Sequence, residues 1–256
     1  MSHAPLPLIA GGPEDLFRLE PVTYAGDRLT GSMLAGPWLA ADDGEVPAGA
    51  VGVLLDDVLG YALIGSRPEG RWSVSAEITV DVLGPLPTEG RLHAEADLVH
   101  VGTLGAFATG RLTDDDGRLV AVGTQRGRFV PMAGDPGSPS YTPVAGSTDV
   151  VRWLSSTYAA SGPFVVPDLM ANPLGNVHGG MSLCLSDLVA RGAVADHLTT
   201  ASLHITYTRA IPVGATLAYT TEVRHAGRGL AVVDVTGSVD SRPATVARVV
   251  LHPRTG

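Results

Sequence analysis

The residues with the clearest chemical potential lie in one segment, residues 172–191, which reads N-P-L-G-N-V-H-G-G-M-S-L-C-L-S-D-L-V-A-R. The His-Gly-Gly at 178–180 closes a loop before an apolar run that can be helical and carries one acid, Asp187. Glycine lets a ligand approach the backbone, and the first amides of a helix lack internal acceptors. Such amides suit a carbonyl oxygen that gains negative charge during reaction. The segment predicts a thioester site that includes Asn172; the alternative is a glycine-closed turn before a capped core helix.

Composition limits the other possibilities. The 256 residues could form one large domain or two of about 125, and either can bury a core. The formal charge of -9 argues against nucleic-acid binding. All 17 basic residues are Arg, so Schiff-base chemistry and a Walker-type phosphate loop, which both need Lys, are excluded. Arginine can still bind the phosphates of coenzyme A (CoA).

The single cysteine, Cys184, excludes an internal disulfide framework and a cysteine-rich metal site. It lies among apolar residues, which predicts packing rather than nucleophilic chemistry. No uninterrupted apolar run reaches 18 residues, and no basic region precedes the short apolar patch at the start. We therefore expect a cytoplasmic protein that does not enter a membrane.

The first half of the chain predicts one buried helix and an antiparallel meander. Residues 1 to about 15 predict a loose terminus, and 16–38 predict one or two strands. The run 51–64 is apolar almost all round and predicts a buried helix, in which Asp56 or Asp57 must face inward or lie near a boundary. Strict alternation over 73–82 predicts a strand with one apolar face: Val74, Ala76, Ile78, Val80 and Val82. Further strands are expected at 91–101, 104–113 and 118–130.

The second half repeats this order. A Pro/Gly/Ser-rich linker at 131–147 precedes an expected short helix at 148–158 and a strand near 163–170. The apolar helix then covers about 180–195, and an alternating strand follows at 201–207. The last strands are expected at 215–225, 229–239 and 243–251.

The two halves match at a nearly constant offset. Asp56 corresponds to Asp187 at an offset of 131, and Ile78 corresponds to Ile205 at 127. The offset changes only across expected loops, as in a duplicated unit. The sequence therefore predicts an N-terminal domain over 16–130, the linker at 131–147 and a C-terminal domain over 148–256.

The spacing at 172–187 also carries a family resemblance. His-Gly-Gly begins six residues after Asn172, and Asp187 follows His178 by nine. This pattern resembles the phenylacetyl-CoA thioesterase (PaaI-type) branch of the hotdog superfamily. The resemblance implies an α+β fold of two tandem hotdog domains, each an antiparallel sheet wrapped round a central helix. It also implies that the halves pair as a double hotdog, hydrolyse an acyl-CoA substrate and need no cofactor or metal; a homodimer of the double unit is expected.

In the resembling family, one unit supplies the Asn and Gly, and its partner supplies the acid and a hydroxyl. Carried over, Asn172 orients the carbonyl or the water, and the Gly179 amide polarises the thioester. Asp56 acts as general base or as nucleophile, and Ser73, five residues before Ile78, helps to hold the water. The expected contributions to CoA binding come from Gly180, Arg209, Arg224 and Arg228, although the arginines could simply keep a strand edge soluble.

The reciprocal site would combine Asp187 and Thr200 with the first-half loop. That loop has Ala41 in place of the Asn and Pro47 in place of the His. We therefore expect one competent and one degenerate site, with Asp187 as the acid if the cross-unit assignment is wrong. Each residue also has a structural alternative: the acid could be a hydrogen-bonded core residue, and His178 could only support its loop.

Two other functions are compatible with this fold. One is a hydratase or dehydratase on CoA or carrier-protein thioesters, which needs an acid five residues before the His; Pro173 stands there. The other is a non-catalytic acyl-CoA binding module, which the degenerate half would favour.

Overall fold

The computed structural model describes residues 11–25, 28–132, 136, 141, 148–160 and 162–254. The helices are α1 (Pro13–Leu16), α2 (Gly52–Gly65), α3 (Val150–Leu154) and α4 (Gly179–Arg191). The strands of the first half are β1 (Thr23–Ala25), β2 (Arg28–Leu34), β3 (Arg71–Val82), β4 (Arg91–Val101), β5 (Gly105–Asp114) and β6 (Leu119–Pro131). Those of the second half are β7 (Phe164–Val165), β8 (Leu198–Tyr207), β9 (Thr216–Ala226), β10 (Ala231–Val239) and β11 (Arg242–Pro253).

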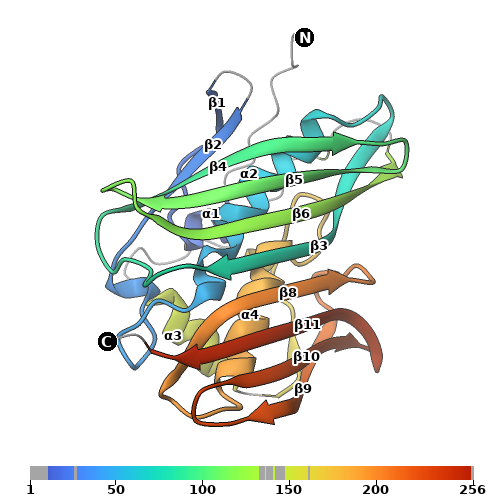
Figure 1. Ribbon diagram of the computed structural model, residues 1–256. Coiled ribbons are helices and arrows are strands. Elements are labelled where there is room, and N and C mark those ends of the chain that lie inside the picture. Colours follow the sequence, from blue (N-terminus) through green and yellow to red (C-terminus); the bar gives the residue numbers. More distant parts are fainter. Residues whose placement is uncertain are drawn as a thin grey trace.

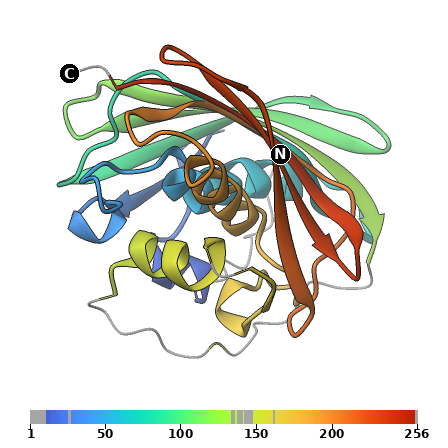
Figure 2. The ribbon, with the colours of Figure 1, turned by 90° about the horizontal axis from the view of Figure 1, so that it is seen from below.

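All these strands form one antiparallel sheet in the order β1-β2-β4-β5-β6-β3-β8-β11-β10-β9-β7. The halves meet where β3 pairs with β8 (Figure 1). The central helices α2 and α4 lie on the concave side of the sheet, and α3 lies beyond them, away from the sheet (Figure 2). The predicted α+β fold is confirmed.

The apolar composition of α2 follows from its position in the core. With the preceding turn, Ala48–Gly65 has a mean hydropathy of 1.5 and is long enough to cross a membrane, but 78% of it is buried inside the protein. Gly52 lies where α2 crosses α4, because a Cβ on it would be only 2.7 Å from the Gly180 carbonyl oxygen. Burial against the sheet and against α4 therefore accounts for the apolar surface of this helix.

A β-bulge interrupts each central strand and corrects the predicted alternation. In β3 the register shifts between Ser75 and Glu77, and in β8 it shifts between Thr200 and Ser202. A bulge sets two residues opposite one, so the side-chain faces exchange there. Ser75 consequently joins Ile78 on the side facing the helices, so Val74 does not share the face of Ile78, Val80 and Val82 as predicted.

Two local expectations also change. Only Phe164–Val165 of the strand expected near 163–170 is extended, and a 3-10 turn, Asp168–Met170, follows Pro167. Residues 11–16 are ordered rather than loose, since α1 includes the buried Glu14 and Leu16; residues 1–10 lie outside the described residues. Of the expected linker, the structure describes Pro131, Met132, Pro136 and Tyr141.

Candidate active site

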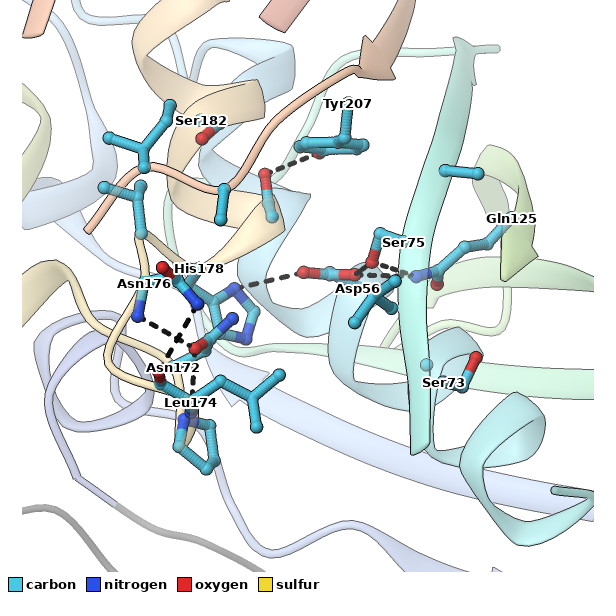
Figure 3. A pocket seen from close by; sticks show the side chains of 18 of the residues that line it. Asp56, Ser73, Ser75, Gln125, Asn172, Leu174, Asn176, His178, Ser182 and Tyr207 are labelled. Carbon is cyan, nitrogen blue, oxygen red and sulfur yellow. Dashed lines mark hydrogen bonds and ion pairs between the residues drawn. The ribbon is translucent and has the colours of Figure 1, made fainter. Parts of the chain in front are cut away.

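A cavity of about 420 Å³ is lined by both halves of the chain. The first half contributes the polar face of α2 and the beginning of β3, which pairs with β8 only over residues 77–81. The second half contributes the loop 172–179, part of α4 and residues 207–211 after β8. Figure 3 shows Asp56, Ser75 and Gln125 on one side of this cavity and His178, Asn172 and Asn176 on the other.

Asp56 lies at the centre of a hydrogen-bond network. Its Oδ1 accepts from Ser75 Oγ at 3.1 Å and from Gln125 Nε2 at 2.8 Å, while Gln125 Nε2 also donates to Ser75 Oγ at 2.7 Å. Its Oδ2 accepts from the Gly180 amide of the other half at 2.8 Å. The side chain is 7% exposed and lines the cavity. An acid, a hydroxyl and an amide from α2, β3 and β6 thus converge with a helix N-terminus of the second half.

His178 joins this network to a second acid. Its Nδ1 lies 3.2 Å from Asp56 Oδ2, and its Nε2 lies 3.0 Å from Asp57 Oδ1. Burial lowers the pKa of His178, but the charges of Asp56, Asp57 and Glu14 outweigh that effect and raise it to about 10. The imidazole is therefore protonated at neutral pH; its Nε2 donates to Asp57, and its Nδ1 lies at ion-pair distance from Asp56. The Gly180 amide also lies 3.1 Å from Nδ1, which can accept a hydrogen bond only when it carries no proton; the shorter contact of this amide, 2.8 Å, is with Asp56 Oδ2.

Glu14 of α1 extends this buried acidic cluster. Burial and the charge of Asp57 raise the pKa of Glu14 to about 8, and burial raises the pKa of Asp57. Donor atoms of Glu14, Asp57 and His178 lie within 4.8 Å of one another, so these side chains could hold a metal ion. Both ring nitrogens of His178 also face carboxylates, so sharing of protons is a second way to hold these side chains together.

Hydrogen bonds hold the loop before α4 and the first residue of that helix in place. Asn172 lines the cavity, and its Oδ1 accepts from the amides of Leu174 and Asn176 at 2.9 and 3.2 Å, which shapes the loop. Tyr207 donates to the Gly179 carbonyl oxygen at 2.7 Å and so fixes that residue. A Cβ on Gly179 would lie 2.5 Å from Asp56 Oδ2, so only glycine allows this approach.

Asp187 has a comparable position in the other half. Its Oδ2 accepts from the Gly49 amide at 2.8 Å, and its Oδ1 accepts from Thr200 Oγ1 at 2.5 Å. This repeats the contacts of Asp56 with Gly180 and Ser75. Asp187 is 0% exposed, however, and is absent from the lining of the cavity around Asp56. Gln125 pairs with Ile78 of β3. Ile205 is the equivalent of Ile78, and its partner is Ala247, so the surroundings of Asp187 lack the side-chain amide that Gln125 provides at Asp56.

The three candidate arginines differ in whether they line the cavity. Arg209 lines the cavity, and so does Arg128 of β6, which sequence reasoning had not included. Arg224 forms ion pairs with Glu222 and with Asp234, the latter at 2.6 Å. Neither Arg224 nor Arg228 lines the cavity, which leaves the edge-strand alternative for Arg224.

The hydroxyl that contacts Asp56 belongs to Ser75, two residues after the predicted Ser73. Ser73 is 8% exposed and lines the cavity, but Ser75 makes the contact with Asp56, as Figure 3 shows. Thr200 stands five residues before Ile205, and the same count back from Ile78 gives Ser73. The count fails because the bulge in β3 and the bulge in β8 lie at different distances from Ile78 and Ile205. The sequence also did not predict a site role for Gln125, Asp57 or Glu14. Only Asp57 left a signal, as a second acid beside Asp56 in an apolar run.

Comparison with known proteins identifies the class. The model of the acyl-CoA thioesterase C-terminal domain matches residues 18–129, and that of the N-terminal domain matches residues 168–252. The two matches together span well over half of the chain, in the reverse of the order that their names give. The chain therefore belongs to the hotdog acyl-CoA thioesterases and is a thioester hydrolase. No curated protein sequence matches it.

Solved structures agree on the fold. An acyl-ACP thioesterase from Bacteroides thetaiotaomicron is similar with a TM-score of 0.64 and 12% identity, covering 88% of this chain and 98% of its own. A 12:0-ACP thioesterase from Umbellularia californica gives 0.64 and 12%, covering 91% and 100%. A tesB protein from Mycobacterium avium subs paratuberculosis gives 0.60 and 12%, covering 91% and 96%.

Proposed function

We propose that the chain hydrolyses an acyl-CoA thioester in the cavity between its two halves, which pair as a double hotdog, with Asp56 as the general base. The observation that supports this most directly is the convergence of Asp56, Ser75 and Gln125 with the N-terminus of α4. In this proposal, the loop before α4 comes from the second half, whose spacing of Asn172, His178 and Asp187 resembles the PaaI-type branch. Arg128 and Arg209 at the cavity are suited to the CoA phosphates.

In the proposed reaction, water adds to the thioester carbonyl carbon while Asp56 takes its proton. The developing oxyanion is stabilised at the N-terminus of α4, where Gly179 supplies an amide; one such donor is typically worth about 3 kcal/mol. The carbon–sulfur bond then breaks, and Asp56 returns the proton to the CoA sulfur. Three hydrogen-bond donors and the His178 imidazolium surround the Asp56 carboxylate, and the Ser75 hydroxyl can turn about a single bond to admit the water. No cofactor enters this scheme.

Thiol release from a panel of acyl-CoA esters tests the proposal. We expect release of free CoA and of the acid from at least one ester. Binding of acyl-CoA without thiol release would instead support the non-catalytic module. Loss of an enoyl-CoA without thiol release would support the hydratase, although the buried imidazolium of His178 is unsuited to act as its base.

The contact between Ser75 and Asp56 predicts a difference between two neighbouring serines. Ser75→Ala removes a hydrogen bond to a charged acceptor, which is worth about 1.5–3 kcal/mol, so we expect kcat to fall roughly 10- to 100-fold. Ser73→Ala is the matched control, because Ser73 lies on the same strand and the same cavity without that contact. Steady-state kinetics of both variants make the comparison. A larger loss in Ser73→Ala would contradict this assignment.

A further inference from the structure

One residue of the cavity wall is a glycine in the interior of a helix. Gly60 lies in α2 and lines the cavity one turn after Asp56. Residues 51–59 and 61–63 are all buried, whereas Gly60 is partly exposed. The helix therefore opens onto the cavity at this residue.

Neither the backbone nor the packing requires glycine there. Gly60 belongs to a right-handed helix, where glycine is less stable than alanine. A Cβ on Gly60 would have Gln125 Nε2 at 3.7 Å and Asp56 Oδ1 at 3.9 Å as its nearest neighbours, which are ordinary van der Waals distances. Gly52, in contrast, leaves no room for a Cβ beside α4. The space beside Gly60 lies directly at the Asp56–Gln125 pair.

The cavity continues past Gly60 between apolar side chains. Tyr61 and Ile64 follow on the same helix, and Trp72 of β3 is also among the lining residues. At a rise of about 1.5 Å per residue, Asp56 and Ile64 are separated by roughly 12 Å along the helix, the length of a medium alkyl chain. This apolar region is suited to hydrocarbon rather than to the charged part of CoA.

We propose that Gly60 determines acyl-chain specificity: an unbranched medium-length acyl chain passes over Gly60 from the thioester at Asp56 toward Ile64 and Trp72. This inference rests on the proposed function, since it places the thioester carbonyl at Asp56. The missing side chain provides the passage, and a larger residue closes it. Acetyl groups end before the passage, whereas longer chains need it.

The test measures kcat/KM for acetyl-CoA and decanoyl-CoA in the wild type, Gly60→Leu and Gly60→Ala. We expect the decanoyl-to-acetyl ratio to fall at least about tenfold in Gly60→Leu, because a leucine fills the passage. Gly60→Ala should lower the ratio less and raise the unfolding temperature. The matched control is Gly192→Leu: Gly192 ends α4 with helical φ and ψ of -65° and -14°, is exposed and lies away from the cavity. Its ratio should stay at the wild-type value.

An unchanged ratio in folded Gly60→Leu overturns the inference. If that variant does not fold, Gly60→Ala and Ile64→Ala carry the test; the latter enlarges the far end and should raise the preference for chains longer than decanoyl. Calorimetry with the non-hydrolysable thioether of decanoyl-CoA distinguishes the two levels of the argument. Weaker binding to Gly60→Leu, with no thiol release even by the wild type, would retain the acyl passage and reject the hydrolysis.

Discussion

Asp56→Asn is expected to lower kcat for thioester hydrolysis by about 10²- to 10⁴-fold, the usual contribution of a general base. Asparagine keeps the size of the side chain but cannot take a proton from water. One of the two carboxylate oxygens is replaced by an NH2 group, which cannot accept from the donors around it, so the variant is expected to lose stability. The rates are therefore compared at equal folded fraction. Single-turnover rates measure the chemical step, and circular dichroism measures the fold.

Asp187→Asn is the matched control, since Asp187 has the same kind of contacts with a helix-start amide and a hydroxyl. We expect it to lower the free energy of unfolding, because Asp187 is fully buried, and to leave kcat nearly unchanged. Equal losses of kcat in the two variants would refute the assignment of a single working acid.

Stability should fall as the pH rises from about 4.5 to about 10. Glu14 has its pKa raised by burial from 4.5 to about 8, so the folded chain retains a proton that the unfolded chain releases. Despite burial, the nearby carboxylates raise the pKa of His178 from 6.5 to about 10. The Glu14 contribution is complete below pH 4.5 and lost through pH 8; the His178 contribution is complete below 6.5 and lost through 10. Since one unit corresponds to about 1.4 kcal/mol, the total decline should be several kcal/mol.

Urea unfolding across this pH range measures the decline. Glu14→Gln is the control, because glutamine keeps the size of the side chain and does not titrate. It should flatten the profile between pH 4.5 and 6.5 and leave, above pH 6.5, the decline assigned to His178. A profile that rises with pH in the wild type would contradict the proposed protonation states.

Most of the fold was predictable, because hydrophobic periodicity follows directly from burial. The strand predicted at 91–101 coincides with β4, and the apolar run 51–64 lies almost entirely within α2. The offset of 131 that relates Asp56 to Asp187 also relates Gly49 to Gly180, and the two amides make equivalent contacts with the two acids. A duplicated pattern thus predicted which backbone groups occupy equivalent positions.

The remaining site residues depend on features that leave little trace in a sequence. A bulge changes which face a serine occupies, so Ser75 could not be distinguished from Ser73 by counting. Gln125 reaches Asp56 because β6 lies beside β3, and that pairing joins residues 47 apart in a register that only the sheet shows. Glu14 precedes the predicted domain and was assigned to a loose terminus, yet α1 brings it into the core.

The contacts at Asp56 and Asp187 bear on how the surroundings of the two acids can change. In an assembly of identical subunits, symmetry repeats each substitution in every pocket. Here the surroundings of each acid are encoded separately, so Pro47 can take the position equivalent to His178, and Ala247 that equivalent to Gln125, without harm to the Asp56 network. Under the proposed function, one polypeptide dedicates one acid to chemistry and the other to holding the scaffold together, a division of labour closed to a symmetric dimer.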